Sequence, residues 1–292
     1  MDINPIGKLY ICATPIGNLG DITPRVVDTL KEVDLIAAED TRNSLKILNR
    51  FGISTPMTSY HEHNKYEKAE ELILKLKEGQ NIAVITDAGT PCISDPGNEL
   101  IKAAIEAGIR VVGIPGCCAA VNALSVCGFD LTSFMFYGFF PRENADRKRM
   151  IEKMRRGDTK TFVLYESPKR IMELVDFFID IGAKCRMCLC NDMTKLHEMT
   201  FRGTPSEVRD ALLAKGNYEK GEYVTVVEID DEYIFNKVEH TVSAEAMLVD
   251  AMLSGGVSPK EAVAAVLADE NNSYSKNELK AAALNLKRMF GE

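Results

Sequence analysis

Short apolar runs alternate with polar segments of helical period along the first part of the chain. This alternation predicts βα units packed on a mainly parallel sheet. Thr23 followed by Pro24 is typical of a helix start, with a capping hydroxyl before a proline in the first turn. The expected strands are 9–13, 35–38, 81–86 and 110–114, and the expected helices include 65–78 and 97–107.

A second alternating series follows Pro115-Gly116 and gives way to a stretch of helices alone. Its expected strands are 134–139, 161–165, 183–190 and 223–229, with helices at 147–156, 168–181 and 205–214. Further helices are expected at 243–253, 258–267 and 275–290, after a separating stretch at 233–239. We therefore expect an α/β protein with domains at 1–116 and 117–232 and a small C-terminal helical appendage at 240–292.

Composition is that of a folded protein outside the membrane. The 292 residues are 46% hydrophobic, and no run approaches the roughly 20 apolar residues of a spanning helix. Residues 1–8 do not resemble a signal peptide, so we expect a cytoplasmic protein with reduced cysteines and no membrane partner. Cys185, Cys188 and Cys190 fit a buried strand, and no metal is expected because no second Cys/His pair follows at zinc spacing.

The net charge of −8 argues against a generally basic nucleic-acid surface, because phosphate binding needs clustered Lys and Arg. Residues 142–160 depart from this balance, with eight basic side chains against four acidic ones. Such a run is either a solvated helix face or a local RNA-binding patch. A second basic group comprises Lys276, Lys280, Lys287 and Arg288.

Three loops that contain Gly and Pro follow expected strands, at 14–21, 87–91 and 115–119. Ligand clefts of open α/β sheets lie at the carboxyl ends of strands, so these loops predict one cleft. No phosphate-binding motif of the G-x-x-x-x-G-K type occurs, and proline has no N–H to donate to an anion. Asp87 would repel a phosphate. The loops therefore favour a ligand with a neutral or positive reacting end.

Two polar clusters also follow apolar runs, at 38–42 and 59–64. His61 and His63 would point the same way on an extended segment, which permits a metal pair, but substrate binding or acid/base work fits them better. Asp40 and Thr41 could equally serve as a helix cap.

These motifs together resemble the ribosomal RNA small subunit methyltransferase I family, within the tetrapyrrole methylases. The resemblance covers residues 7–230, in order. The segments that carry it are 9–23, 38–42, 61–64, 86–97, 138–141, 165–170, 194–198 and 220–224.

The resemblance implies two αβα domains with S-adenosylmethionine bound between them, usually in a homodimer. It implies 2′-O-methylation of a cytidine in 16S rRNA, in the assembled small ribosomal subunit. Carried over by position, the residues at the cofactor would be Pro15, Gly17, Asp87, Gly89, Thr90, Cys118, Ala119, Tyr165 and Met193.

Two departures from the family pattern concern this cleft. Cys117-Cys118 stands where Pro-Ser or a similar pair is usual, which removes a hydroxyl and leaves backbone contacts possible. Asn191-Asp192-Met193 stands where Arg-Glu-Leu is common, and this change puts a catalytic role for Asp192 in doubt.

Methyl transfer to a ribose hydroxyl needs alignment of the reacting atoms and a base within hydrogen-bond reach. Asp40, His61 and Glu166 are the candidate bases. Lys195 is expected at the reacting centre with Arg42 and Asn64, where they would orient the ribose and phosphates. Arg147 and Arg149 are expected to contact RNA. The rival functions are C-methylation of a tetrapyrrole and non-catalytic RNA binding in ribosome assembly.

Overall fold

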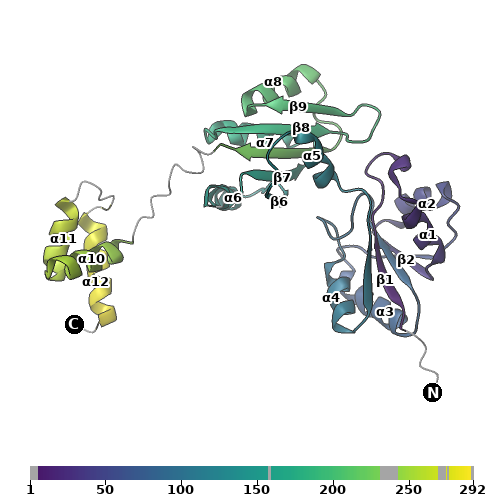
Figure 1. The fold of residues 1–292 in the computed structure, drawn as a ribbon, viewed down its shortest axis with the longest axis horizontal. Coiled ribbons are helices and arrows are strands. Elements are labelled where there is room, and N and C mark those ends of the chain that lie inside the picture. The colour runs from purple at the N-terminus through teal and green to yellow at the C-terminus, as the bar shows by residue number, and fades with distance from the viewer. Residues whose placement is uncertain (1–5, 157–158, 231–242, 269–273, 275, 291–292) are drawn as a thin grey trace. The chain divides into compact units, whose positions relative to one another are not determined.

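The computed structural model describes residues 6–156, 159–230, 243–268, 274 and 276–290. The chain divides into two compact units between residues 234 and 235 (Figure 1). The separating stretch expected at 233–239 and the domain limits at 232 and 240 lie outside the described residues. The first unit holds two sheets, and the second holds helices.

The first sheet is parallel throughout, with strand order β3-β2-β4-β1-β5. Its strands are β1 (Lys8–Cys12), β2 (Leu35–Ala38), β3 (Met57–Ser59), β4 (Ile82–Ile85) and β5 (Arg110–Ile114). The helices are α1 (Pro24–Glu32), α2 (Thr41–Arg50), α3 (Lys65–Lys77) and α4 (Asn98–Glu106). Because every strand runs the same way, the loops that follow them meet at one edge.

Two apolar clusters cover the two faces of this sheet. Leu9, Val84 and their neighbours pack on α3 and α4, whereas Cys12, Ile36 and Ile85 belong to the cluster of α1 and α2. Thr23 caps α1 by accepting from the Val26 N–H at 3.3 Å, as its position before Pro24 predicts. This packing fixes the strand ends that carry the candidate loops.

The second sheet is mixed, with order β6-β7-β10-β8-β9. Only β6 and β7 pair in parallel, and the other neighbours are antiparallel. Its strands are β6 (Phe134–Phe139), β7 (Thr161–Glu166), β8 (Cys185–Asn191), β9 (Met199–Gly203) and β10 (Tyr223–Ile229). Cys185, Cys188 and Cys190 lie buried in β8, as the sequence predicts.

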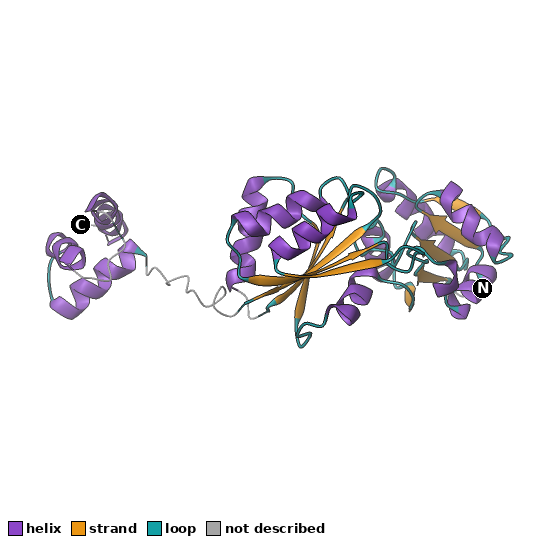
Figure 2. Ribbon diagram, turned by 90° about the horizontal axis from the view of Figure 1, so that it is seen from above, coloured by secondary structure: helices purple, strands orange, loops and turns teal. Residues whose placement is uncertain are grey.

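Helices cover both faces of the second sheet (Figure 2). They are α5 (Ala119–Cys127), α6 (Asn144–Arg156), α7 (Ile171–Asp180) and α8 (Pro205–Lys215). Residues of α5 pack on Val163 and Val226, whereas those of α6, α7 and α8 pack on Phe162 and Leu189 of the opposite face. The alternation along β7 thus places α5, which follows the third candidate loop, on its own side of the sheet.

The C-terminal unit has its own apolar core. Its helices are α10 (Ala244–Gly255), α11 (Pro259–Ala268) and α12 (Lys276–Phe290), and Leu248, Val266 and Leu279 pack among them. Ser243 accepts from the Ala246 N–H at 3.1 Å and caps α10. The α/β class with a helical appendage is therefore confirmed. In the part of the chain that the structure describes, no helix has the length and apolar character needed to cross a bilayer.

Candidate active site

A cavity of about 390 Å³ lies between the carboxyl edge of the first sheet and loops of the second. The first sheet contributes Ile16, Ala88, Gly89, Thr90, Ile93, Ser94 and Asp95. The remaining lining residues are Cys118, Ala119, Phe139, Tyr165, Glu166, Ser167, Pro168, Met193, Glu222, Tyr223 and Val224. The three candidate loops thus meet in one place.

Most residues expected at a cofactor line this cavity. They are Gly89, Thr90, Cys118, Ala119, Tyr165 and Met193. Pro15 and Gly17 flank Ile16, which lines the wall, without lining it themselves. Asp87 also lies outside the lining, where its carboxylate accepts from Asn43 Nδ2 at 2.9 Å and from the Asp40 N–H at 3.3 Å.

Hydrogen bonds tie the cavity loops to one another. Thr14 and Gly89 exchange backbone bonds of 2.8 and 3.0 Å. Thr90 Oγ1 donates to the Cys117 carbonyl at 2.8 Å, and the Tyr165 hydroxyl accepts from the Ala120 N–H at 3.1 Å. Gly89 has a φ of +86°, a left-handed conformation that glycine adopts without strain. The cavity walls are therefore held in place before a ligand arrives.

Glu39, Asp87 and Asp95 form a group of carboxylates beside the cavity, and of these three only Asp95 lines it. Burial, together with the charges of Glu39 and Asp87, raises the pKa of Asp95 to about 6. Burial also raises the pKa of Glu39. The sequence pattern gives Asp95 no special role, although Asp95 lies within 86–97, one of the segments that carry the family resemblance. Its loop is held in an unusual shape, since Cys92 and Ser94 have φ values of 73° and 72°.

Asp40 caps α2, as the alternative interpretation of the sequence predicts. It accepts from the Arg42 N–H at 2.8 Å and from the Arg42 guanidinium at 3.1 and 2.8 Å. These hydrogen bonds lower the pKa of Asp40 to about 2. A carboxylate so well stabilised is a weak base. The Arg42 guanidinium is bound to this same carboxylate.

His61 and Asn64 belong to the loop between β3 and α3. Asn64 Oδ1 accepts from the His61 N–H at 2.8 Å, and its amide donates to the Ser59 carbonyl at 3.3 Å. Asn64 thus shapes the loop, while His61 Nδ1 is buried and has no hydrogen-bond partner among the described residues. The rings of His61 and His63 lie 6.0 Å apart. No group of three potential metal ligands occurs among the described residues.

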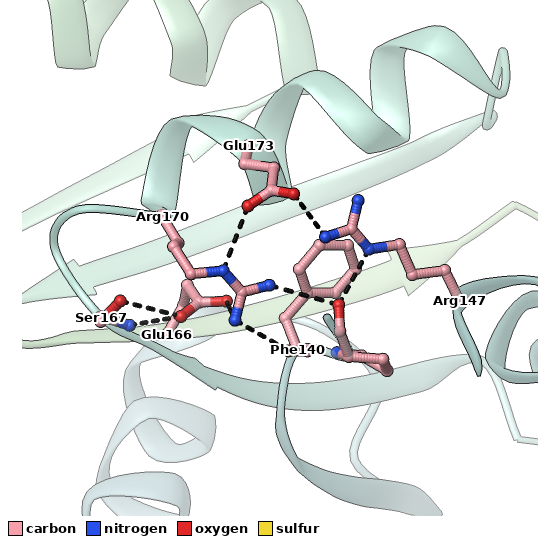
Figure 3. A network of polar contacts seen from close by, with 7 residues as sticks. Phe140, Arg147, Glu166, Ser167, Arg170 and Glu173 are labelled. Atoms are coloured by element: carbon pink, nitrogen blue, oxygen red, sulfur yellow. Dashed lines mark hydrogen bonds and ion pairs between the residues drawn. The ribbon is translucent and has the colours of Figure 1, made fainter. Parts of the chain in front are cut away.

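Glu166 lies at the end of β7 in the network drawn in Figure 3. Its Oε1 accepts from the Ser167 N–H at 2.6 Å and from Ser167 Oγ at 3.1 Å, and its Oε2 lies 3.3 Å from Arg170. Glu166 is only 3% exposed, and Arg170 is the cation that lies beside its buried carboxylate. Glu166 also lines the cavity, and its Oε2 is buried with the ion-pair contact to Arg170 but no hydrogen-bond partner among the described residues.

Arg147 joins the same network from α6 (Figure 3). Its guanidinium donates to the Pro141 carbonyl at 2.8 Å, binds Glu173, and lies 4.6 Å from the centre of the Phe140 ring. It therefore points into the protein. Arg149, with a side chain that is 70% exposed, pairs with Asp146. The exposed cations of this run are Arg142, Lys148, Arg149 and Lys153, and the side chains of 155–158 lie outside those described.

Arg170→Met is expected to lower the free energy of unfolding by about 3–5 kcal/mol, because it leaves Glu166 buried without its cation. Urea denaturation measures this loss. The matched control is Arg149→Met, which removes an exposed pair and should cost under about 1 kcal/mol. Equal losses of unfolding free energy in the two variants would show that the buried ion pair stabilises the fold no more than an exposed pair does.

Lys195 lies in the loop between β8 and β9. Its Nζ donates to Asp192 and to Glu222, both at 2.8 Å. Burial would lower the pKa of Lys195, but these bonds outweigh burial and raise it. Gly17 fits closely here, since a Cβ on it would lie 2.6 Å from Lys195 Cγ. Asp192, the departure noted above, thus positions Lys195 beside the first loop.

The fold and the cavity define an α/β protein with a ligand cleft at the carboxyl edge of a parallel sheet, closed by a second, mixed sheet. The chain belongs to the tetrapyrrole (corrin/porphyrin) methylase family, whose model matches residues 8–209. The family expected from the motifs is therefore confirmed.

Two relatives that share a name match almost the whole chain. The ribosomal RNA small subunit methyltransferase I of Haemophilus influenzae is 43% identical over 94% of this chain and 95% of its own. The protein of that name from Escherichia coli O157:H7 is 41% identical over 96% of each chain. A solved structure of uroporphyrin-III C-methyltransferase from Thermus thermophilus, complexed with S-adenosyl homocysteine, has a TM-score of 0.52. It covers 76% of this chain and 97% of its own at 15% identity, which shows the shared fold.

Proposed function

We propose that this protein transfers a methyl group from S-adenosylmethionine to 16S rRNA of the small ribosomal subunit, at the 2′-hydroxyl of a cytidine. The observation that carries the proposal is the cavity at the carboxyl edge of the first sheet, in a chain over 40% identical to proteins named as small subunit rRNA methyltransferases. The tetrapyrrole enzyme compared above is 15% identical to this chain, and that likeness shows the fold alone.

The cavity fits S-adenosylmethionine in size and charge. Its volume of about 390 Å³ lies in the range of small-molecule sites. Ile16, Met193 and Val224 supply apolar wall, and Gly89 and Thr90 bring the second loop against it. The neighbouring carboxylates suit the cationic sulfonium of this cofactor and would repel a polyphosphate. Tyr165, whose pKa burial raises to about 12, stays neutral in the cavity lining.

Asp95 is the best-placed base for the reaction. Asp40 has both carboxylate oxygens bonded to Arg42, and Glu166 accepts from Ser167 through Oε1 and faces the Arg170 cation through Oε2. Asp95 faces the cavity with a pKa close to neutral, which suits a general base. His61 remains a second candidate through its unpaired Nδ1.

The cofactor supplies a methyl group whose bond to the positively charged sulfur breaks as the new carbon–oxygen bond forms. The Asp95 carboxylate would accept the proton that the 2′-hydroxyl gives up. Lys195 donates to Asp192 and Glu222 near the cavity, and it would exchange one of these partners to bind a phosphate or ribose oxygen. Exposed cations of α6 add RNA contacts outside the cavity.

A homodimer in the cytoplasm is the expected state of the protein. Phe134 and Met135 on the edge strand β6 are 48% and 36% exposed, and Val121 on α5 is 58% exposed. Exposed apolar side chains on a sheet edge favour association with another chain. Light scattering of the purified protein measures its mass, and a monomer at all concentrations would contradict this part of the proposal.

Labelled methyl transfer tests the activity. Purified protein and S-adenosylmethionine with a labelled methyl group are incubated separately with assembled small subunits, naked 16S rRNA and a uroporphyrinogen. The proposal predicts label in RNA, with assembled subunits as the better substrate. Label in the tetrapyrrole alone would establish the C-methyltransferase. RNA binding without cofactor binding would establish a non-catalytic assembly protein.

A further inference from the structure

One face of α12 carries a row of exposed cations. Lys276, Lys280 and Lys287 follow one another at spacings of four and seven residues, so they lie within about 40° of each other around the helix. The row extends along about 16 Å of the helix axis. Arg288 is exposed at the adjoining position. No ion pair involves any of these four side chains within the described residues.

The one acidic residue within α12 lies away from this face. Glu278, the one acidic residue in the sequence of α12, lies about 180° around the helix from the row. On the neighbouring helices, Glu261 accepts from Ser258 and Glu245 accepts from Asn285. A basic face in a chain of net charge −8 is a local feature that the overall composition conceals.

One side of α12 packs against the other helices of the C-terminal unit. Leu279, Ala282 and Leu286 are buried in the core of the C-terminal unit. Leu284 and Met289 of α12 are 52% and 77% exposed, but they lie about 140° apart around the helix, so α12 has no continuous apolar face to lay into a membrane, as basic amphipathic helices at membranes do. A polyanion is the partner that an exposed row of cations fits.

The distribution of the unit among relatives points to the kind of polyanion. The family model ends at residue 209, and the tetrapyrrole enzyme compared above matches 76% of this chain with 97% of its own. The relatives named for ribosomal RNA match 94% and 96% of this chain, which leaves too few residues unmatched to omit the unit. Two other relatives of that name match only 76% and 75% of this chain, so the unit has a matching counterpart in some of the proteins named for RNA and not in all of them.

We infer that the C-terminal unit is an RNA-binding module in which Lys276, Lys280, Lys287 and Arg288 bind backbone phosphates of the substrate RNA. This inference rests on the proposed function for the identity of the RNA. The module adds affinity to the contacts made at the catalytic cleft and takes no part in cofactor binding.

The test uses the full chain with all four residues changed to glutamine, and 16S rRNA as the probe. RNA affinity is expected to fall about 10- to 100-fold near 0.1 M salt, and the slope of log affinity against log salt to fall by about 3. The affinity for S-adenosyl homocysteine and the melting temperature should not change. The matched control changes four exposed cations of the first-sheet helices to glutamine: Lys31, Arg50, Lys77 and Lys102.

An unchanged RNA affinity and salt slope in the α12 variant would overturn the inference, as would equal losses in the control variant. A loss confined to assembled subunits, with naked RNA unaffected, would also overturn it and would indicate contact with a ribosomal protein. Failure of the proposed function is a separate result, because the unaltered chain would then transfer no methyl group to RNA in either form.

Discussion

Asp95→Asn is expected to slow methyl transfer about 10²- to 10⁴-fold, the range for loss of a general base. The amide keeps the size of the side chain at the cavity wall but cannot accept the proton. Single-turnover transfer at saturating cofactor measures the effect directly. Below the Asp95 pKa of about 6 the unaltered enzyme should lose about tenfold in rate per pH unit, and the variant should lack this dependence.

The raised pKa of Asp95 predicts that Asp95→Asn slows methyl transfer without destabilising the fold. Because the pKa of Asp95 is raised in the folded state, the folded protein binds the proton more tightly, and the carboxylate opposes stability above pH 6. The melting temperature of Asp95→Asn at neutral pH should therefore equal or exceed that of the unaltered chain. Asp28→Asn, on the exposed face of α1, is the control and should change neither rate nor pH profile. A variant at Asp95 with normal rates would leave His61 as the base.

Gly89→Val is expected to weaken S-adenosyl homocysteine binding about 10- to 100-fold, equivalent to strain of about 1–3 kcal/mol in the binding loop. Gly89 has a φ of +86°, and an added Cβ would lie 3.5 Å from Ile16 of the cavity wall. A branched side chain cannot keep this conformation without displacing the backbone that bonds Thr14. Titration calorimetry measures the affinity.

Gly52→Val is the matched control for the glycine variant. Gly52 also has a left-handed φ, +63°, but no atom lies within 4 Å of an added Cβ, and it is outside the cavity. Its substitution should lower the melting temperature by a similar amount and leave cofactor affinity unchanged. Equal affinities for the two variants would show that the second loop does not hold the cofactor.

The fold could be predicted because most elements are long enough to show their period. The expected strand at 223–229 is the observed β10, and the three C-terminal helices lie where polar caps and apolar spacing predict them. β3 was not predicted as a strand, since Met57–Ser59 is too short for a pattern. The strand order of each sheet depends on contacts between distant segments, which a single sequence does not reveal.

The site was predictable by location more than by role. Loops after parallel strands had to meet at one edge, so the cavity lies where expected. The sequence could not show that Arg147 turns inward to Pro141 and Glu173, because a charge run is ordinarily solvated. Nor could it separate Asp95 from other acidic residues, since its pKa depends on Glu39 and Asp87, which are distant along the chain.

Mapping of methylated nucleosides in ribosomal RNA tests the central claim most directly. RNA of the small subunit is compared by mass spectrometry between cells that carry the gene, cells that lack it, and cells that carry the Asp95→Asn form. The account predicts that one 2′-O-methylcytidine disappears from 16S rRNA without the gene and is not restored by the variant. An unchanged methylation map in cells without the gene would contradict the proposed function.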